Sequence, residues 1–221
     1  MKILVIGTIL HFEECRQKLG NHVYTHVQSG AEAEKILTRS EVIFDFLIDK
    51  DPGAFEMYAN KPVTAFLNTC KINLSALVHQ VASPPLCTVF GYNGLPTLFN
   101  REFLEVSLLK SEDTPLLKKI CQQLSTEYLL VDDRVGLVTP RVICMIINEA
   151  YYTVQEGTAS REDIDLAMKL GTNYPYGPFE WCDRIGLKNV YQLLEAVYED
   201  TKDERYKISA LLKKEYLLSP R

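Results

Sequence analysis

Histidine is the side chain best suited to accept a proton near neutral pH, so the four histidines are the first residues to weigh as a catalytic base. His11 lies in a glycine turn near the amino terminus, and His22 and His26 flank an apolar segment. His79 lies near the end of a short predicted helix, where a surface or capped histidine is common. One of them could reach a site by folding, but no spacing predicts it, so the sequence alone predicts none of the four as a base.

The six cysteines do not form a metal-binding or redox pattern. They stand at positions 15, 70, 87, 121, 144 and 182, without a CxxC pair, and mostly inside predicted elements. Because no secretory signal is recognisable, this pattern favours free buried thiols in a reducing cytoplasm. We therefore expect no metal site and a cytoplasmic protein.

Charge and hydropathy exclude two classes of partner. The formal net charge is −5, which argues against a general nucleic-acid surface. There is no run of 18 apolar residues to span a membrane, and the first apolar run, "ILVIG", is too short for a signal peptide. That run is typical of a buried first strand. We expect neither nucleic acid nor a membrane as a partner.

The amino-terminal half alternates apolar strand patterns with short helical patterns. This alternation predicts an α/β unit with an abbreviated, Rossmann-like parallel sheet, and we place it at residues 1–134. Strands are expected at residues 3–6, 23–27, 42–48, 63–67, 86–90 and 128–131, and helices at 11–19, 31–37, 53–59 and 116–124.

The first strand, turn and helix have the order of a dinucleotide-binding motif, in "VIGTILHFEEC". Such a motif needs glycines that let the backbone approach a pyrophosphate at the helix start. Only Gly7 is present; the next two glycine positions hold Ile9 and Phe12, whose side chains we expect to stand in the space of the pyrophosphate. Residues 26–28, at the end of the second strand, include no acid to bind a ribose. The residues therefore argue against ordinary NAD binding.

The carboxy-terminal half, residues 135–221, reads as an all-helical domain. Apolar positions at steps of three and four predict a long helix over residues 138–154, which Gly157 ends. Ser160 begins a second helix with a capping box, and we expect Gly171 to close it. Pro178 is placed to begin a third helix at its first turn.

This half resembles the carboxy-terminal domain of the 3-hydroxyacyl-CoA dehydrogenases, and the chain is similar to a shortened, 3-hydroxybutyryl-CoA dehydrogenase-like member. The resemblance rests on "INEAYYTVQEGTASREDIDLAMKLGTNYPYGPFEWCDRIGL" and, further on, "DERYKISALLKK". It implies a domain that forms a homodimer interface and closes over an acyl-CoA, in a family that oxidises 3-hydroxyacyl-CoA with NAD during fatty acid metabolism.

The same resemblance suggests site residues in the amino-terminal half. Gly7 and Asn68 match positions near the cofactor, and Asp49, in "EVIFDFLID", matches an acid beside the nicotinamide ribose, although it could equally end a strand before a turn. In "FLNTCKINLSAL", Cys70 replaces a serine that meets the substrate, and Asn93 matches a family asparagine.

The family's proton acceptor is changed. Its histidine position holds Phe90, which cannot accept a proton, while Glu105 matches the glutamate that orients this histidine. Glu105 could be a lone buried base or a polar residue at a strand edge. Pro140 stands at a family asparagine position, and it also suits the first turn of the long helix.

Two functions follow from these residues. The first is an oxidoreductase of the 3-hydroxyacyl-CoA type, impaired or inactive or working with unusual residues. The second is a non-catalytic homodimer derived from that fold, which binds acyl-CoA or a protein partner. Loss of a general base typically costs about 10²–10⁴ in rate, so the residues favour the second.

Overall fold

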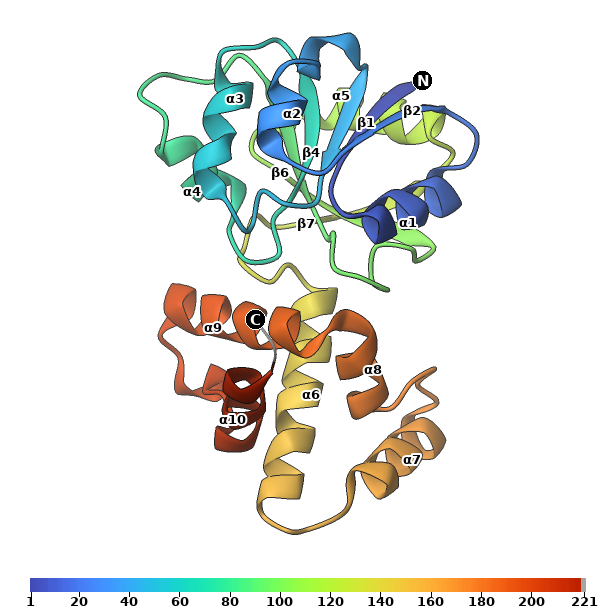
Figure 1. Ribbon diagram of the computed structural model, residues 1–221, viewed down its shortest axis with the longest axis vertical. Coiled ribbons are helices and arrows are strands. Elements are labelled where there is room, and N and C mark those ends of the chain that lie inside the picture. The colour runs from blue at the N-terminus through green and yellow to red at the C-terminus, as the bar shows by residue number, and fades with distance from the viewer. Residues whose placement is uncertain (220–221) are drawn as a thin grey trace. The chain divides into compact units, whose positions relative to one another are not determined.

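The computed structural model describes residues 1–219 and forms two compact units, Met1–Leu137 and Val138–Arg221. The first unit is an α/β sheet unit and the second is entirely helical, as the sequence predicts (Figure 1).

A seven-stranded sheet with the order β2-β1-β3-β4-β5-β6-β7 is the centre of the first unit. The strands are β1 (Lys2–Ile6), β2 (Val23–Val27), β3 (Val42–Asp45), β4 (Thr64–Asn68), β5 (Thr88–Tyr92), β6 (Phe103–Leu108) and β7 (Glu127–Val131). The predicted parallel pairing is confirmed from β1 to β5, and β7 is parallel to β6. β6 runs antiparallel to β5 because no crossover helix connects the two strands.

Helices cover both faces of the sheet (Figure 1). On one face, α1 (Ile9–Leu19) and α5 (Thr114–Gln123) bury Cys15, Leu19, Leu117 and Ile120 against aromatic and branched strand residues. On the other face lie α2 (Gly30–Glu34), α3 (Glu56–Ala59) and α4 (Leu74–His79), with the 3-10 turns Leu37–Arg39 and Pro52–Phe55. All six cysteines are buried and free, as expected.

The third strand is shorter than the predicted 42–48 because Asp45 ends it. One oxygen of this buried carboxylate accepts the backbone N–H groups of Leu47 (2.7 Å) and Ile48 (3.1 Å), and the other accepts the hydroxyl of Tyr58 (2.8 Å). These bonds turn the backbone away from the sheet. Burial raises the pKa of Asp45 to about 6.

The second unit packs four helices around the central α6 (Thr139–Gln155). They are α7 (Arg161–Thr172), α8 (Pro178–Ile185), α9 (Leu187–Thr201) and α10 (Ala210–Leu218). Gly157 has the left-handed φ of 73° expected after a helix end, and the Ser160 hydroxyl caps α7. The expectation for Gly171 is wrong: it lies inside α7, and Asn173, with φ 56°, ends the helix. Within residues 1–219, no helix is both long and apolar enough to cross a membrane.

Asp165 of α7 caps the neighbouring helix α8. Its two carboxylate oxygens accept the backbone N–H groups of Phe179 (2.8 Å) and Glu180 (3.2 Å). The approach is so close that a Cβ on Gly177 would lie 2.3 Å from the Asp165 carboxyl carbon. The last acid of the "EDID" segment therefore caps the helix that the "GPFE" segment begins.

Asn148 fixes the segment that leads into α10. This buried side chain donates to the carbonyl of Lys207 (2.9 Å) and accepts the N–H of Ser209 (3.0 Å). The "NEA" run of the long helix thus has a structural role.

The first unit extends six residues beyond its last strand. Asp133 accepts the N–H groups of Leu74 (2.8 Å) and Ser75 (2.9 Å), which begin α4. Gly136, with φ 85°, donates its N–H to the carbonyl of Cys70 (2.8 Å). Residues 132–137 are therefore hydrogen-bonded to the loop that follows β4 and to the start of α4.

Candidate functional site

Most of the predicted site residues gather at the carboxyl edge of the parallel strands. Gly7 follows β1, Asp49 lies in the turn after β3, Asn68 and Cys70 end and follow β4, and Asn93 follows β5. In an open α/β sheet this edge, at the point where strand order reverses around β1 and β3, is where ligands bind.

The turn after β1 is closed by its own side chains. The backbone N–H of Thr8 donates to His11 Nδ1 (3.2 Å), and the N–H of His11 donates to the Thr8 hydroxyl (3.4 Å). The imidazole stacks on Phe46, with ring centroids 4.6 Å apart. A Cβ on Gly7 would lie 2.7 Å from His11 Nδ1, so the glycine leaves room for the imidazole.

His11 is held neutral by its surroundings. Burial lowers its pKa to about 4, and the electrostatic influence of Lys50 and His26 acts in the same direction. Because Nδ1 already accepts the Thr8 N–H, this nitrogen is occupied as a structural acceptor.

His11, rather than Ile9 or Phe12, is the residue that reaches over the turn. Ile9 is 52% exposed, and the ring of Phe12 stacks on His26 at 4.8 Å. His26 in turn donates from Nε2 to the carbonyl of Gly7 (2.8 Å). These contacts tie the turn to β2 at the place where a dinucleotide motif leaves backbone groups free.

Asp49 forms a buried ion pair that the sequence analysis did not anticipate. Its carboxylate lies 3.4 Å from the Lys71 ammonium, and the two side chains are 1% and 8% exposed. Burial raises the pKa of Asp49, while Lys71 and Lys50 oppose this shift. No local pattern in the sequence signals this pair, because Lys71 lies three residues beyond the end of β4 and far from Asp49 along the chain.

Asn68, Cys70 and Asn93 belong to one buried network. The amide oxygen of Asn68 accepts the N–H groups of Cys70 (3.4 Å) and Gly94 (3.1 Å). The Cys70 thiol donates to the amide oxygen of Asn93 (3.4 Å). Burial raises the pKa of Cys70 well above its ordinary value, so the thiol is not a nucleophile in this state. The structure therefore brings these three predicted residues together.

Phe90 and Glu105 do not recreate an acid–base pair. Phe90 is fully buried in the core, against Phe66 at 5.0 Å between ring centroids. Glu105, on β6, is 8% exposed, and its backbone carbonyl accepts the N–H of Asn93 (3.3 Å). The histidines lie elsewhere: three around the first turn and β2, and His79 exposed at the end of α4.

Pro140 has the local role suggested by its position. It is a buried residue of the first turn of α6, where a missing N–H costs nothing.

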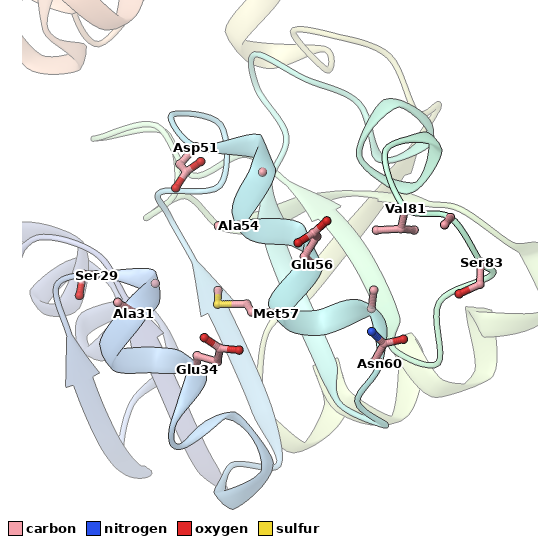
Figure 2. A pocket seen from close by; sticks show the side chains of 14 residues that line it. Ser29, Ala31, Glu34, Asp51, Ala54, Glu56, Met57, Asn60, Val81 and Ser83 are labelled. Atoms are coloured by element: carbon pink, nitrogen blue, oxygen red, sulfur yellow. The ribbon is translucent and has the colours of Figure 1, made fainter.

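A separate hollow of about 740 Å³ lies between α2 and α3 (Figure 2). Figure 2 shows Glu34 and Glu56 on either side of Met57, with Asp51 just before the 3-10 turn Pro52–Phe55. These carboxylates would repel a phosphate, and the hollow contains none of the predicted site residues. Among the described residues, no group of three or more His, Cys, Asp or Glu side chains could hold a metal ion.

Comparison with known proteins places this fold in a family. Residues 136–218 match the family described as "3-hydroxyacyl-CoA dehydrogenase, C-terminal domain". The 3-hydroxyadipyl-CoA dehydrogenase of Escherichia coli K12 is 42% identical over 97 residues, which is 44% of this chain and 20% of that protein. The probable 3-hydroxybutyryl-CoA dehydrogenase of Bacillus subtilis is 38% identical over 108 residues, 48% of this chain and 38% of that protein.

The likeness extends to the whole fold. The crystal structure of (S)-3-hydroxybutyryl-CoA dehydrogenase from Ralstonia eutropha superposes with a TM-score of 0.69 at 18% identity, covering 96% of this chain and 92% of the other. The aligned part of this chain spans between a fifth and two fifths of the two curated relatives above. Residues 136–218 therefore belong to the family of the 3-hydroxyacyl-CoA dehydrogenase carboxy-terminal domain, and the whole chain shares the fold of a solved 3-hydroxybutyryl-CoA dehydrogenase.

Proposed function

We propose that this chain is a homodimeric acyl-CoA-binding protein that does not carry out NAD-dependent dehydrogenation. The observation that carries the proposal is the closed turn after β1, in which His11 and Thr8 cap one another. The dehydrogenases of this family use NAD, and this turn is the place where the dinucleotide pyrophosphate is bound in such folds.

The residues of this turn do not fit the cofactor. A pyrophosphate needs free backbone N–H groups and glycines that allow its close approach. Here the N–H groups of Thr8 and His11 are bonded inside the turn, and the imidazole fills the space above Gly7. The end of β2 offers Gln28 where an acid would bind the ribose. We therefore derive no hydride transfer for this chain.

Loss of the proton acceptor points in the same direction. The position of the family's histidine is a phenyl ring buried in the core, and removal of a general base typically lowers rate about 10²–10⁴-fold. The alternative function, dehydrogenation by unusual residues, is favoured by one observation: Glu105 is retained and only 8% exposed.

Acyl-CoA binding is supported by what remains. The helical unit matches the family over residues 136–218, and the polar network of Asn68, Cys70 and Asn93 persists at the ligand edge of the sheet. A thioester carbonyl accepts hydrogen bonds, and asparagine side-chain amides are hydrogen-bond donors.

A second copy of the chain would cover the apolar face of α7. This helix has no buried residue; Leu166 is 53% and Leu170 is 79% exposed, while Val142 on α6 is 50% exposed. Exposed apolar side chains in this number on adjacent helices support an interface rather than an internal core.

Calorimetric titration tests the proposal. We expect no heat with NAD or NADH at a few hundred micromolar, and a binding isotherm with acetoacetyl-CoA. Clear micromolar affinity for NAD in the unmodified protein would contradict it, as would acetoacetyl-CoA reduction sensitive to Glu105→Gln. The triple variant Ile9→Gly, His11→Ala, Phe12→Gly should gain affinity for NAD before any activity appears. Sedimentation should give twice the 25.2 kDa chain mass.

A further inference from the structure

The last strand of the sheet, β7, has an outer edge without a strand partner in the part of the chain that the structure describes. A parallel strand bonds its neighbour through alternate residues, so backbone N–H and C=O groups of the remaining residues of β7 point outward. Edge strands usually carry a lysine, a proline or a bulge that discourages further pairing. β7 reads "EYLLV" and keeps an unbroken register with β6 over its five residues, so it has none of these.

A groove of about 730 Å³ follows this edge. It is lined by one side of α5, the turn after that helix and most of β7, namely Lys118, Cys121, Gln122 and residues 125–130. Leu130 lies on the α5 face of the sheet, because it pairs in register with Val106, a residue of the core that α5 covers. The helix nevertheless leaves Leu130 49% exposed, and Leu129, on the opposite face, is 53% exposed. An added strand would therefore cover apolar side chains on both faces of the sheet.

We propose that β7 and α5 form a docking site for an extended peptide segment of another protein, which joins the sheet as an eighth strand. The backbone of the segment bonds to the outward groups of β7. Its side chains alternate between the two faces, and the row that faces α5 contains apolar residues and a carboxylate. The apolar residues of this row contact Leu130, and the carboxylate pairs with the ammonium of Lys118. This site is independent of acyl-CoA binding.

The charges of the groove favour an acidic segment over a second copy of the chain. Lys118 and the neighbouring Lys119 are both exposed on α5, and Glu127, at the start of β7, is the only acid among the lining residues. A carboxylate placed opposite α5 and away from Glu127 is therefore attracted. A two-fold axis beside β7 would instead place both α5 helices on one face of a continuous sheet. Lys118 of one copy would then approach Lys118 of the other, and the two charges would repel.

Titration with a synthetic strand tests the proposal on the full chain. The probe is a capped seven-residue peptide in which threonine and valine alternate and the central valine is replaced by aspartate. We expect saturable binding, measured by fluorescence anisotropy, and slower hydrogen exchange at the amides of β7 when the peptide is bound. Exchange in β2, the strand at the other end of the sheet, should not change. The same peptide with lysine in place of aspartate should bind more weakly.

Variants on both walls of the groove locate the binding. Lys118→Glu should weaken binding of the aspartate peptide roughly tenfold, because an attraction becomes a repulsion. Leu130→Lys should abolish binding, since a lysine on an edge strand opposes further pairing. The matched control is Val23→Lys, at a side chain 65% exposed on β2, and it should bind the peptide like the native protein. Lys118→Glu changes an exposed helix residue and should keep the native melting temperature, so the test stands even if Leu130→Lys unfolds the sheet.

Four results would overturn the proposal. They are a lack of saturable binding at millimolar peptide, binding without slower exchange in β7, equal binding of the aspartate and lysine peptides, and equal loss of binding in Val23→Lys. If β7 exchanges more slowly at high protein concentration without the peptide, while the mass in sedimentation rises, the occupant is a second copy and the choice of an acidic segment is wrong.

Discussion

Removal of the Asp165 carboxylate should destabilise the helical unit through the start of α8. Asp165→Ala abolishes two hydrogen bonds to the backbone N–H groups of Phe179 and Glu180, made at 2.8 and 3.2 Å. It also removes a negative charge from a helix amino terminus, where such a charge contributes about 0.3–1 kcal/mol.

The magnitude follows from these three losses. Each lost hydrogen bond contributes about 0.5–1.5 kcal/mol, and helix caps as a class about 1 kcal/mol. For the half-buried Asp165 we expect the free energy of unfolding to fall by about 2–3 kcal/mol. Asp165→Asn keeps the shape and one acceptor oxygen, and should cost about half as much.

The assay has a natural reporter, because the single tryptophan, Trp181, lies on α8 itself and is buried. Urea unfolding followed by its fluorescence gives the free energies of the two variants. The exposed Lys214, inside α10 of the same unit, provides the control: Lys214→Ala should stay within about 0.5 kcal/mol of the native protein. The reasoning fails if Asp165→Ala matches this control, or if the alanine and asparagine variants lose equal stability.

Three further predictions follow. His11 has a folded-state pKa of about 4 against an ordinary 6.5, so between these pH values the unfolded chain binds a proton that the folded chain does not. His11 therefore lowers the free energy of unfolding by about 3 kcal/mol as the pH falls from 6.5 to about 4. His11→Gln keeps an acceptor for the Thr8 N–H and should lose this dependence of stability on pH. The pH profile of the variant is subtracted from that of the native protein, because Asp45, with its pKa raised to about 6, stabilises the fold as the pH falls. Gly91→Ala would place a Cβ 2.3 Å from the Ser107 hydroxyl and should cost about 1–3 kcal/mol in thermal unfolding; an unchanged melting temperature would contradict the crowding. Leu170→Lys, at a side chain 79% exposed, should convert a dimer to a monomer in sedimentation without lowering stability, and a persistent dimer would exclude this face.

Local patterns in the sequence predicted most of the elements but not all of their ends. The apolar run before Gly7 and the periodic stripe of the long helix gave β1 and α6, because burial on both faces or on one stripe leaves a direct mark on composition. The predicted ends of the third strand, at residue 48, and of the second carboxy-terminal helix, at Gly171, were wrong for opposite reasons. The carboxylate ends a strand by bonding to residues beyond it, and a helix can hold a glycine when a later residue, here Asn173, ends it.

The direction of β6 could not be read from its residues. A strand of "FLEVSL" type fits a parallel or an antiparallel neighbour, and only the connection decides between them.

The candidate site was predictable as a set of positions but not as a set of contacts. Family spacing pointed to Asp49, Asn68, Cys70 and Asn93, which lie at one edge of the sheet because parallel strands end there together. The partner of Asp49 is a lysine 22 residues further along the chain, and no local pattern reports such a pairing. Their roles in binding stay predictions.

The fastening of residues 132–137 to the loop after β4 sets the smallest version of the amino-terminal half that could be expressed alone. A fragment ending at Val131 would contain every strand of the sheet, yet it would lack both the carboxylate of Asp133 that begins α4 and the N–H of Gly136 that holds the Cys70 carbonyl. One ending at Leu137 would keep both. For dissection by limited proteolysis or split expression, the useful cut therefore lies after the last hydrogen bond rather than after the last strand, and a cut made earlier would loosen the ligand edge while leaving the sheet complete.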